Sequence, residues 1–121
     1  MLKWDETDLI AFFGTIPVVG EDGLYHAFVT QGHGLQLEVT IFAYEEAVYI
    51  SLTRDGLPKP LFTVRREPCT HLRVIDKTNY RCLELGSPQH QVTDMGISPL
   101  LVRGIRIFIE PQFQIELIEP S

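Results

Sequence analysis

The chain has 121 residues, of which 10 are basic, 16 are acidic and 45% are hydrophobic, and its formal net charge is −6. These values are typical of one globular domain with its own core, and we expect residues 1–121 to form a single domain. The longest apolar run, Leu9–Phe13, is far shorter than the roughly 18 residues of a membrane span, and two cysteines are too few for a disulfide framework.

The first predicted element is a short helix over residues 5–13. Asp5 is a typical N-cap, the apolar residues after it form one stripe, and Gly14 is a typical helix stop. Acidic residues are mixed with the apolar ones here, so the segment lacks the basic and then apolar order of a signal peptide. Together with the low cysteine content, this predicts a cytoplasmic, reduced location.

The next part of the chain is predicted to form a three-stranded antiparallel meander. Its strands are expected at 24–31, 35–44 and 47–54. We interpret Gly32-His33-Gly34 as a three-residue loop that places Gln31 opposite Leu35. A tight turn at Glu45-Glu46 then places Ala43 opposite Val48. Both turns put the same apolar residues of the middle strand on one buried face.

The other face of this meander combines polar and aromatic side chains. The residues expected on it are His26, Phe28, Glu38, Thr40, Phe42, Tyr49 and Ser51. A face open to water rarely carries three aromatic residues, so we expect the helix, a partner or a ligand to cover it. It is the candidate ligand face, and His26 with Glu38 would form the acid–base pair if the protein were an enzyme.

Further strands are predicted in the second half of the chain. They are expected at 61–66, 71–76, 81–85, 105–109 and 113–119. Residues 86–96 are predicted to be an exposed loop, and one helical turn is predicted at 98–104. The resulting fold class is α+β or mainly β, with one N-terminal helix and an antiparallel meander of about seven or eight strands in a curled sheet or half-barrel.

Two hairpins in this half have a register that the alternation of apolar residues predicts. In the first, Arg73 lies opposite Glu84 and Asp76 opposite Arg81. The second is centred on Pro111 and pairs Ile105 with Leu117, and a single long bulged strand is the alternative. Since 105–117 is rich in Ile and Phe, we expect these C-terminal strands to form a homodimer.

No pattern of catalytic or ligating residues emerges. Cys69, His71, Cys82 and His90 fall within 22 residues, but their spacing matches no zinc motif. At ~3.3 Å per strand residue the two cysteines would be about 20 Å apart, and we expect one buried and one surface thiol. Because the chain also lacks a nucleophile elbow and a phosphate-binding glycine motif, we predict no catalytic, metal or cofactor-binding residues.

Charge is unevenly distributed along the chain. Residues 1–53 have one base and eight acids, 54–81 have seven bases and three acids, and 82–121 have two bases and five acids. The predicted pairs of Arg73 and Arg81 neutralise part of the basic middle, so we expect no binding to nucleic acid. Acids at turns remain unpaired, and the candidate acidic partner surface consists of Glu21, Asp22, Glu45 and Glu46.

These features lead to three hypotheses of function. The first is a non-enzymatic acidic protein-binding module, similar in action to an immunity protein, an inhibitor or a regulator, which binds a basic partner protein. The second is a small-ligand-binding curled sheet that uses the candidate ligand face. The third is an enzyme that uses the same residues.

Overall fold

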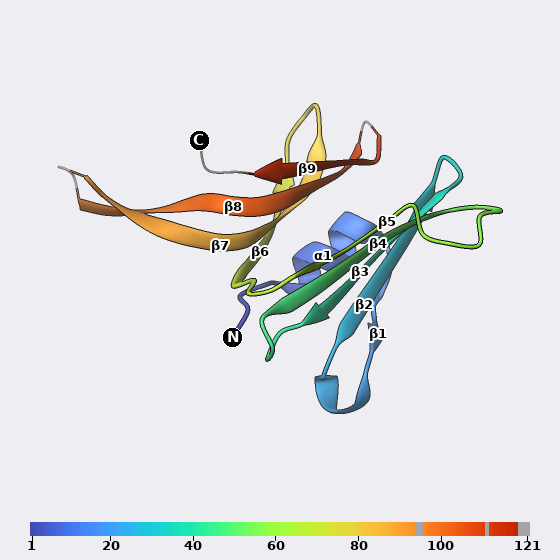
Figure 1. The fold of residues 1–121 in the computed structure, drawn as a ribbon, viewed down its shortest axis with the longest axis horizontal. Helices are drawn as coiled ribbons and strands as arrows, with labels where there is room; N and C mark the ends of the chain where they lie inside the picture. Colours follow the sequence, from blue (N-terminus) through green and yellow to red (C-terminus); the bar gives the residue numbers. More distant parts are fainter. Residues whose placement is uncertain (94–95, 111, 119–121) are drawn as a thin grey trace.

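The computed structural model consists of one α-helix and two antiparallel sheets (Figure 1). It describes residues 1–93, 96–110 and 112–118, and for 87–93, 96–103 and 118 it describes the backbone alone. The elements are α1 (Glu6–Phe13), β1 (Val18–Val19), the 3₁₀ turn η1 (Glu21–Gly23), β2 (His26–Gly32), β3 (Leu35–Phe42), β4 (Ala47–Arg54), β5 (Phe62–Arg66), β6 (His71–Asp76), β7 (Arg81–Thr93), β8 (Gly96–Glu110) and β9 (Gln114–Ile118). The predicted class is confirmed, but the strands are divided into a sheet ordered β1-β2-β3-β4-β5 and a sheet ordered β6-β7-β8-β9, and the sheets do not close into a barrel.

The hairpin of β2 and β3 has a different register from the predicted one. Gly32 lies opposite Leu35, so the turn contains only His33 and Gly34, whose φ angles are 55° and 76°. Positive φ at both central residues is the mark of a type I′ turn, whose twist matches that of the flanking strands. The prediction that Gln31 lies opposite Leu35 is therefore wrong by one residue, and every side chain of β2 lies on the face opposite to the one expected.

The turn between β3 and β4 is longer than predicted, but this difference leaves the faces of both strands unchanged. It spans 43–46, and Ile41 lies opposite Val48. The predicted register paired Ala43 with Val48 and was wrong by two residues. Because side chains alternate with a period of two, the faces of β3 and β4 are nevertheless those expected.

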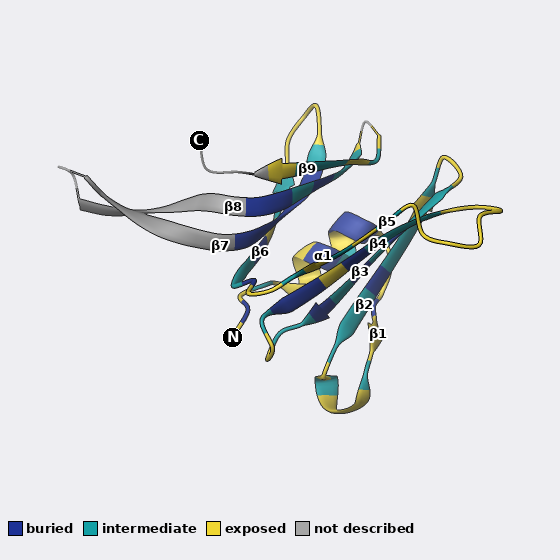
Figure 2. Ribbon diagram, viewed as in Figure 1, coloured by how far each residue is buried: buried dark blue, intermediate teal, exposed yellow. Residues whose placement is uncertain are grey.

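Helix α1 fills one end of the space between the two sheets. The side chain of Asp5 accepts a hydrogen bond from the Asp8 N–H at 3.0 Å, and Gly14 ends the helix with a φ of 73°, as predicted. The buried helix residues Leu9, Phe12 and Phe13 belong to the same core as strands of both sheets. Figure 2 shows these buried segments facing one another along α1, β3, β4, β7 and β8.

The second sheet confirms two predicted hairpins. Arg73 lies opposite Glu84, and Asp76 lies opposite Arg81. Ile105 lies opposite Leu117, which confirms a hairpin of β8 and β9 in place of one bulged strand.

The loop predicted at 86–96 is wrong for residues 86–93 and 96, and the helical turn predicted at 98–104 is also wrong, because these residues lie in strands. Residues 94 and 95 of the predicted loop lie outside the described residues. β7 continues to Thr93 and pairs with β8 from Gly96 onward. A register shift between Ser87 and Pro88 accommodates the proline, since a bulge tolerates a residue that has no N–H to donate.

The N-terminal segment is attached to the outer edge of β6. The Lys3 N–H donates to the Thr70 carbonyl at 2.8 Å, and the Leu72 N–H donates to the Lys3 carbonyl at 3.0 Å. This segment therefore covers the start of one edge of the four-stranded sheet. Among the described residues, no helix has the length and apolar character needed to cross a membrane.

Candidate functional site

The four residues of the candidate acidic partner surface lie in two turns at one end of the five-stranded sheet. Glu21 and Asp22 belong to η1, between β1 and β2, while Glu45 and Glu46 belong to the turn between β3 and β4. In an antiparallel meander these two connections fall at the same end, as Figure 1 shows. Glu46 lies 3.5 Å from the N-terminal amine. Within the described ranges, Glu21, Asp22 and Glu45 form no ion pair.

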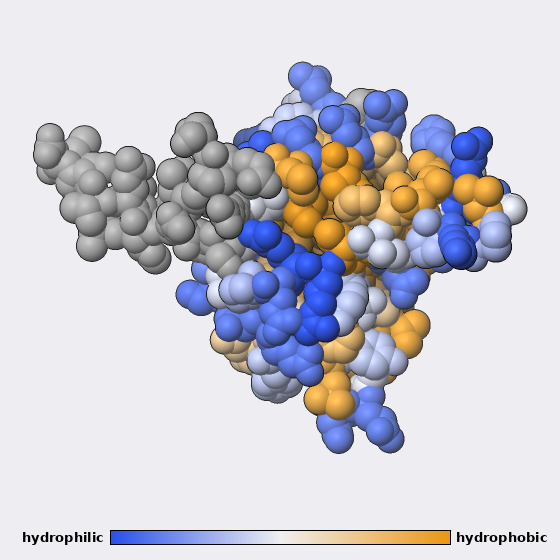
Figure 3. Space-filling model, in the orientation of Figure 1, coloured by the Kyte–Doolittle hydropathy of each residue, from blue (hydrophilic) through white to orange (hydrophobic). Residues whose placement is uncertain are grey.

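Exposed apolar side chains accompany these acids. Leu24, which follows η1, is 57% exposed, and Tyr44, in the β3–β4 turn, is 71% exposed. Figure 3 shows hydrophobic and hydrophilic atoms side by side around the β1–β2 connection, at the bottom of the view. We call this surface, made of Glu21, Asp22, Glu45, Glu46, Leu24 and Tyr44, the acidic end. Large apolar side chains beside charged ones are typical of protein interfaces.

The candidate ligand face is divided between the two faces of the sheet. Glu38, Thr40, Phe42, Tyr49 and Ser51 share the outer face, as expected. In contrast, His26 lies opposite Ile41 and Phe28 opposite Val39, which places both on the inner face beside α1. The shorter β2–β3 turn is the physical reason for this difference, because it shifts the register by one residue.

This division also separates the two residues of the predicted acid–base pair. His26 Nε2 lies 3.4 Å from Oε2 of Glu6 in α1, and its ring packs edge-on against Trp4 at 4.8 Å between centroids. Glu38 lies on the outer face, so the pairing of His26 with Glu38 is wrong. The contacts of His26 connect the first turn of α1 to β2, which is a structural role.

Aromatic rings do gather on the outer face, but they cover one another. The ring of Phe42 lies 5.8 Å from that of Tyr25 and 5.5 Å from that of Tyr49. The guanidinium of Arg65 lies 4.9 Å from the centre of the Tyr49 ring, and its Nη1 donates a hydrogen bond to the Tyr49 hydroxyl. The aromatic content of this face, from which we inferred a cover, is therefore largely explained by contacts within the chain.

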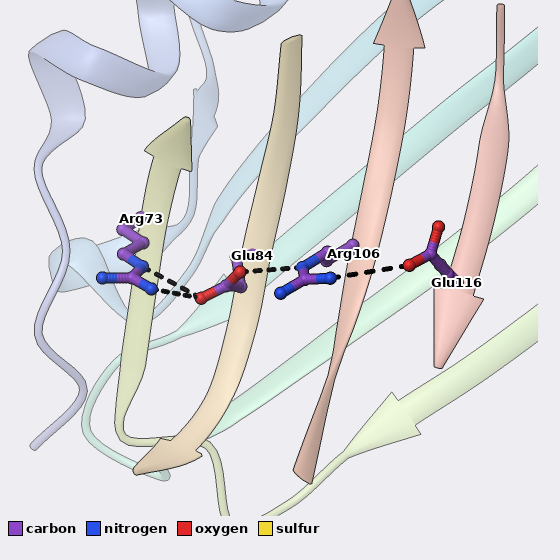
Figure 4. A network of polar contacts seen from close by, with 4 residues as sticks. All are labelled: Arg73, Glu84, Arg106 and Glu116. Carbon is purple, nitrogen blue, oxygen red and sulfur yellow. Dashed lines mark hydrogen bonds and ion pairs between the residues drawn. The ribbon is translucent and has the colours of Figure 1, made fainter. Parts of the chain in front are cut away.

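The outer face of the second sheet carries a row of four alternating charges, Arg73, Glu84, Arg106 and Glu116, one from each strand (Figure 4). Glu84 Oε1 accepts from Arg73 Nη2 at 2.6 Å, and Glu84 Oε2 accepts from Arg106 Nε at 2.9 Å. Arg106 Nη1 also lies 3.5 Å from Glu116 Oε1. The sequence predicted the pair of Arg73 and Glu84, but not that Arg106 of β8 donates to the same carboxylate.

Glu84 is ionised in this row although its side chain is only 2% exposed. Burial alone would raise the pKa of the carboxyl, but the hydrogen bonds from Arg106 and Arg73 outweigh burial and hold the pKa below its usual value. The carboxylate is thus fixed as an acceptor for both arginines.

Both cysteines are free and buried, so the expected surface thiol is wrong. Burial raises the pKa of Cys69 to about 11, and burial also raises the pKa of Cys82. Such thiols are weak nucleophiles at neutral pH. Among the residues that the structure describes, no group of three or more His, Cys, Asp or Glu side chains is arranged to hold a metal ion.

An apolar groove that the sequence did not predict opens between the two sheets at the end that α1 leaves uncovered. Its volume is about 400 Å³. The five-stranded sheet contributes Leu37, Leu52 and Phe62, and the β8–β9 hairpin contributes Ile107, Phe113, Ile115 and Leu117. Figure 3 shows this hydrophobic surface between β9 and the five-stranded sheet.

Comparison with known proteins finds a similarity in fold. No family model and no curated protein matches the sequence. A chain of the contact-dependent growth inhibition toxin–immunity protein complex from Klebsiella pneumoniae 342 has the same fold, with a TM-score of 0.73 over 96% of this chain and 94% of that chain. The two sequences are 15% identical, so what they share is the arrangement of helix and sheets.

Proposed function

We propose that this chain is a non-enzymatic, immunity-like protein-binding module that binds a basic partner protein through its acidic end. The observation that carries the proposal is the position of two acidic turns at one end of the five-stranded sheet, beside exposed Leu24 and Tyr44. The fold similarity to a chain of a toxin–immunity protein complex supports it. Uncompensated acids around apolar contacts favour fast and specific association with a cationic surface.

Three of the seven basic residues at 54–81 are neutralised within the chain. Arg65 pairs with Glu67, Arg73 with Glu84, and Arg81 with Asp76 and Glu110. These cations are therefore occupied by acids of the same chain, whereas Glu21, Asp22 and Glu45 have no cationic partner among the described residues. Glu21, Asp22 and Glu45 are thus available to a cationic partner.

Charge reversal at the acidic end tests the proposal. The partner is first captured from a lysate of the source organism with the tagged chain and purified. Its affinity is then measured by calorimetry for the wild type and for a variant with Glu21→Lys, Asp22→Lys and Glu45→Lys. Glu46 is left intact because it contacts the N-terminus. We expect the variant to bind at least about tenfold more weakly, because three acids that face a cationic surface become bases. A tenfold loss of affinity corresponds to about 1.4 kcal/mol of binding free energy.

A control carries the same change of charge elsewhere, with Asp55→Lys, Asp76→Lys and Glu110→Lys, and circular dichroism checks that it is folded because Asp76 and Glu110 both pair with Arg81. These acids are also exposed. The control should bind within about twofold of the wild type at physiological ionic strength, where distant charges are screened. Equal affinities of all three proteins, or an equal loss in the control, would overturn the proposal.

A further inference from the structure

The alternating row of charges on the second sheet ends at an open edge. β9 is the last strand of its sheet and is hydrogen-bonded to β8 alone. Glu116, at the middle of β9, is 45% exposed, and among the described residues its ion-pair partner is Arg106 on the inner neighbour. The row therefore ends on an acid at the unpaired edge of the sheet, where a further strand could pair with β9.

The residues on either side of Glu116 present apolar side chains to the opposite face. Ile115 and Leu117 line the groove together with Leu52 and Phe62, and Leu117 is 61% exposed. Consecutive strand residues point to opposite faces, so the edge offers apolar, acidic and apolar side chains in succession. A neighbouring strand lies about 4.8 Å away, so its alternate side chains would enter the groove beside Ile115 and Leu117.

We propose that the edge of β9 accepts an extended strand of a basic protein partner, in which a cationic residue lies between two apolar ones. The cation would lie opposite Glu116 and continue the alternation of Arg73, Glu84, Arg106 and Glu116 by one strand. The two apolar side chains would fill the groove, while the backbone adds hydrogen bonds to β9. This inference rests on the proposed function and identifies a second contact and the chemistry of the segment bound there.

A second copy of this chain matches the edge less well. The charged residue of β9 is Glu116, so two β9 strands in any register provide no cation opposite it. Among the described strands, the matching pattern occurs in β6, with Leu72, Arg73 and Val74, and in β8, with Ile105, Arg106 and Ile107. β8 is already paired with β7 on one side and with β9 on the other, so it cannot pair with a second copy. Likewise, Lys3 already bonds to the outer edge of β6. The charges therefore favour a partner strand over the homodimer expected from the sequence.

Peptide binding followed by NMR tests this inference. The probe is a capped pentapeptide, Thr-Ile-Arg-Ile-Thr, compared with the same peptide carrying Glu in place of Arg. We expect the Arg peptide to shift the backbone amide signals of 114–118 and to bind about three- to tenfold more tightly than the Glu peptide, in the range of cross-strand charge pairs. In the Glu116→Lys protein this preference should reverse.

Asp76→Lys is the matched control. Asp76 is an exposed acid on β6, at the other edge of the same sheet, and like Glu116 it pairs with one arginine. Each substitution removes one exposed ion pair, so both proteins should remain folded. The control should keep the preference for the Arg peptide.

Three results would overturn the inference: neither peptide shifts the β9 amides, Glu116→Lys keeps the preference for Arg, or light scattering shows a dimer that Glu116→Lys dissociates. The last result would assign the edge to a second copy. If the captured partner binds Glu116→Lys as tightly as the wild type but loses affinity for the acidic-end variant, this inference alone fails. If the peptide binds β9 but the acidic-end variant keeps full affinity, the proposed function of the acidic end alone fails.

Discussion

The guanidinium of Arg73 lies with its Nη2 atom 2.6 Å from Oε1 of Glu84, a carboxylate whose side chain is 2% exposed. A buried carboxylate of this kind is costly unless its oxygens are hydrogen-bonded. Here Arg73 also donates from Nε, and Arg106 donates to the second oxygen. The buried acid thus connects β6, β7 and β8, and it supports the sheet whose last strand is β9.

We expect Glu84→Ala to lower the free energy of unfolding by about 2–3 kcal/mol, because three charge-assisted hydrogen bonds are lost. The loss should stay below that of a fully buried pair, since Arg73 is exposed and can bind water. Urea unfolding at pH 7 measures it. As a control, Glu110→Ala removes an exposed carboxylate 3.6 Å from Arg81 and should cost below about 1 kcal/mol. Equal losses in the two variants would contradict this account.

Glu84 should also make stability depend on acid pH. Its pKa is lower in the folded protein than in the unfolded chain, so its contribution is complete above the ordinary glutamate pKa of about 4.3. That contribution is lost as the pH falls through the lower, folded pKa. We expect the difference in free energy of unfolding between the wild type and Glu84→Gln to shrink between pH 5 and pH 3, at roughly 1.4 kcal/mol per pKa unit at most. Urea titrations at several pH values in this range measure it, and a constant difference would exclude an ionised Glu84.

The predicted register was correct where only one pairing of two strands placed their apolar residues on the same face. In the β6–β7 hairpin, apolar residues and opposite charges such as Arg73 and Glu84 select the same pairing, so two signals agree. Gly32-His33-Gly34 is different, because its glycines permit a loop of either two or three residues. The shorter turn is favoured by strand twist, and the error moved His26 and Phe28 to the wrong face.

The prolines of the second sheet gave misleading signals. Ser87-Pro88 resembles a turn and Ser98-Pro99 resembles the start of a helix, yet both lie in paired strands. Local propensity is weak evidence when a long neighbouring strand can supply hydrogen bonds. The acidic residues of the candidate site were recognisable from their turns, whereas the groove was not. The groove depends on how the two sheets lie relative to each other beyond the end of α1. The alternation of apolar and polar residues within one strand carries no information on that arrangement.

Both cysteines should resist modification in the folded protein. Cys69 and Cys82 are buried, and the raised pKa of each thiol keeps it protonated at neutral pH. We expect Ellman's reagent at pH 8 to react with neither thiol on a timescale of minutes, and with both in denaturing urea. Thr63→Cys, on the exposed surface of β5, is the control and should react at once. Rapid reaction of one native thiol would show that its surroundings open readily.

The type I′ turn between β2 and β3 gives a stabilising substitution. His33 adopts a φ of 55°, a conformation that asparagine tolerates better, and it precedes Gly34 with a φ of 76°. We expect His33→Asn to raise the free energy of unfolding by about 0.5 kcal/mol, because Asn-Gly is the preferred pair for this turn. Gly34→Ala should lower it by about 1 kcal/mol or more, since an added Cβ strains the left-handed backbone. No atom lies within 4 Å of that Cβ, so the loss would come from the backbone and not from a clash. A stabilising Gly34→Ala would contradict the left-handed conformation of Gly34 and with it the type I′ turn.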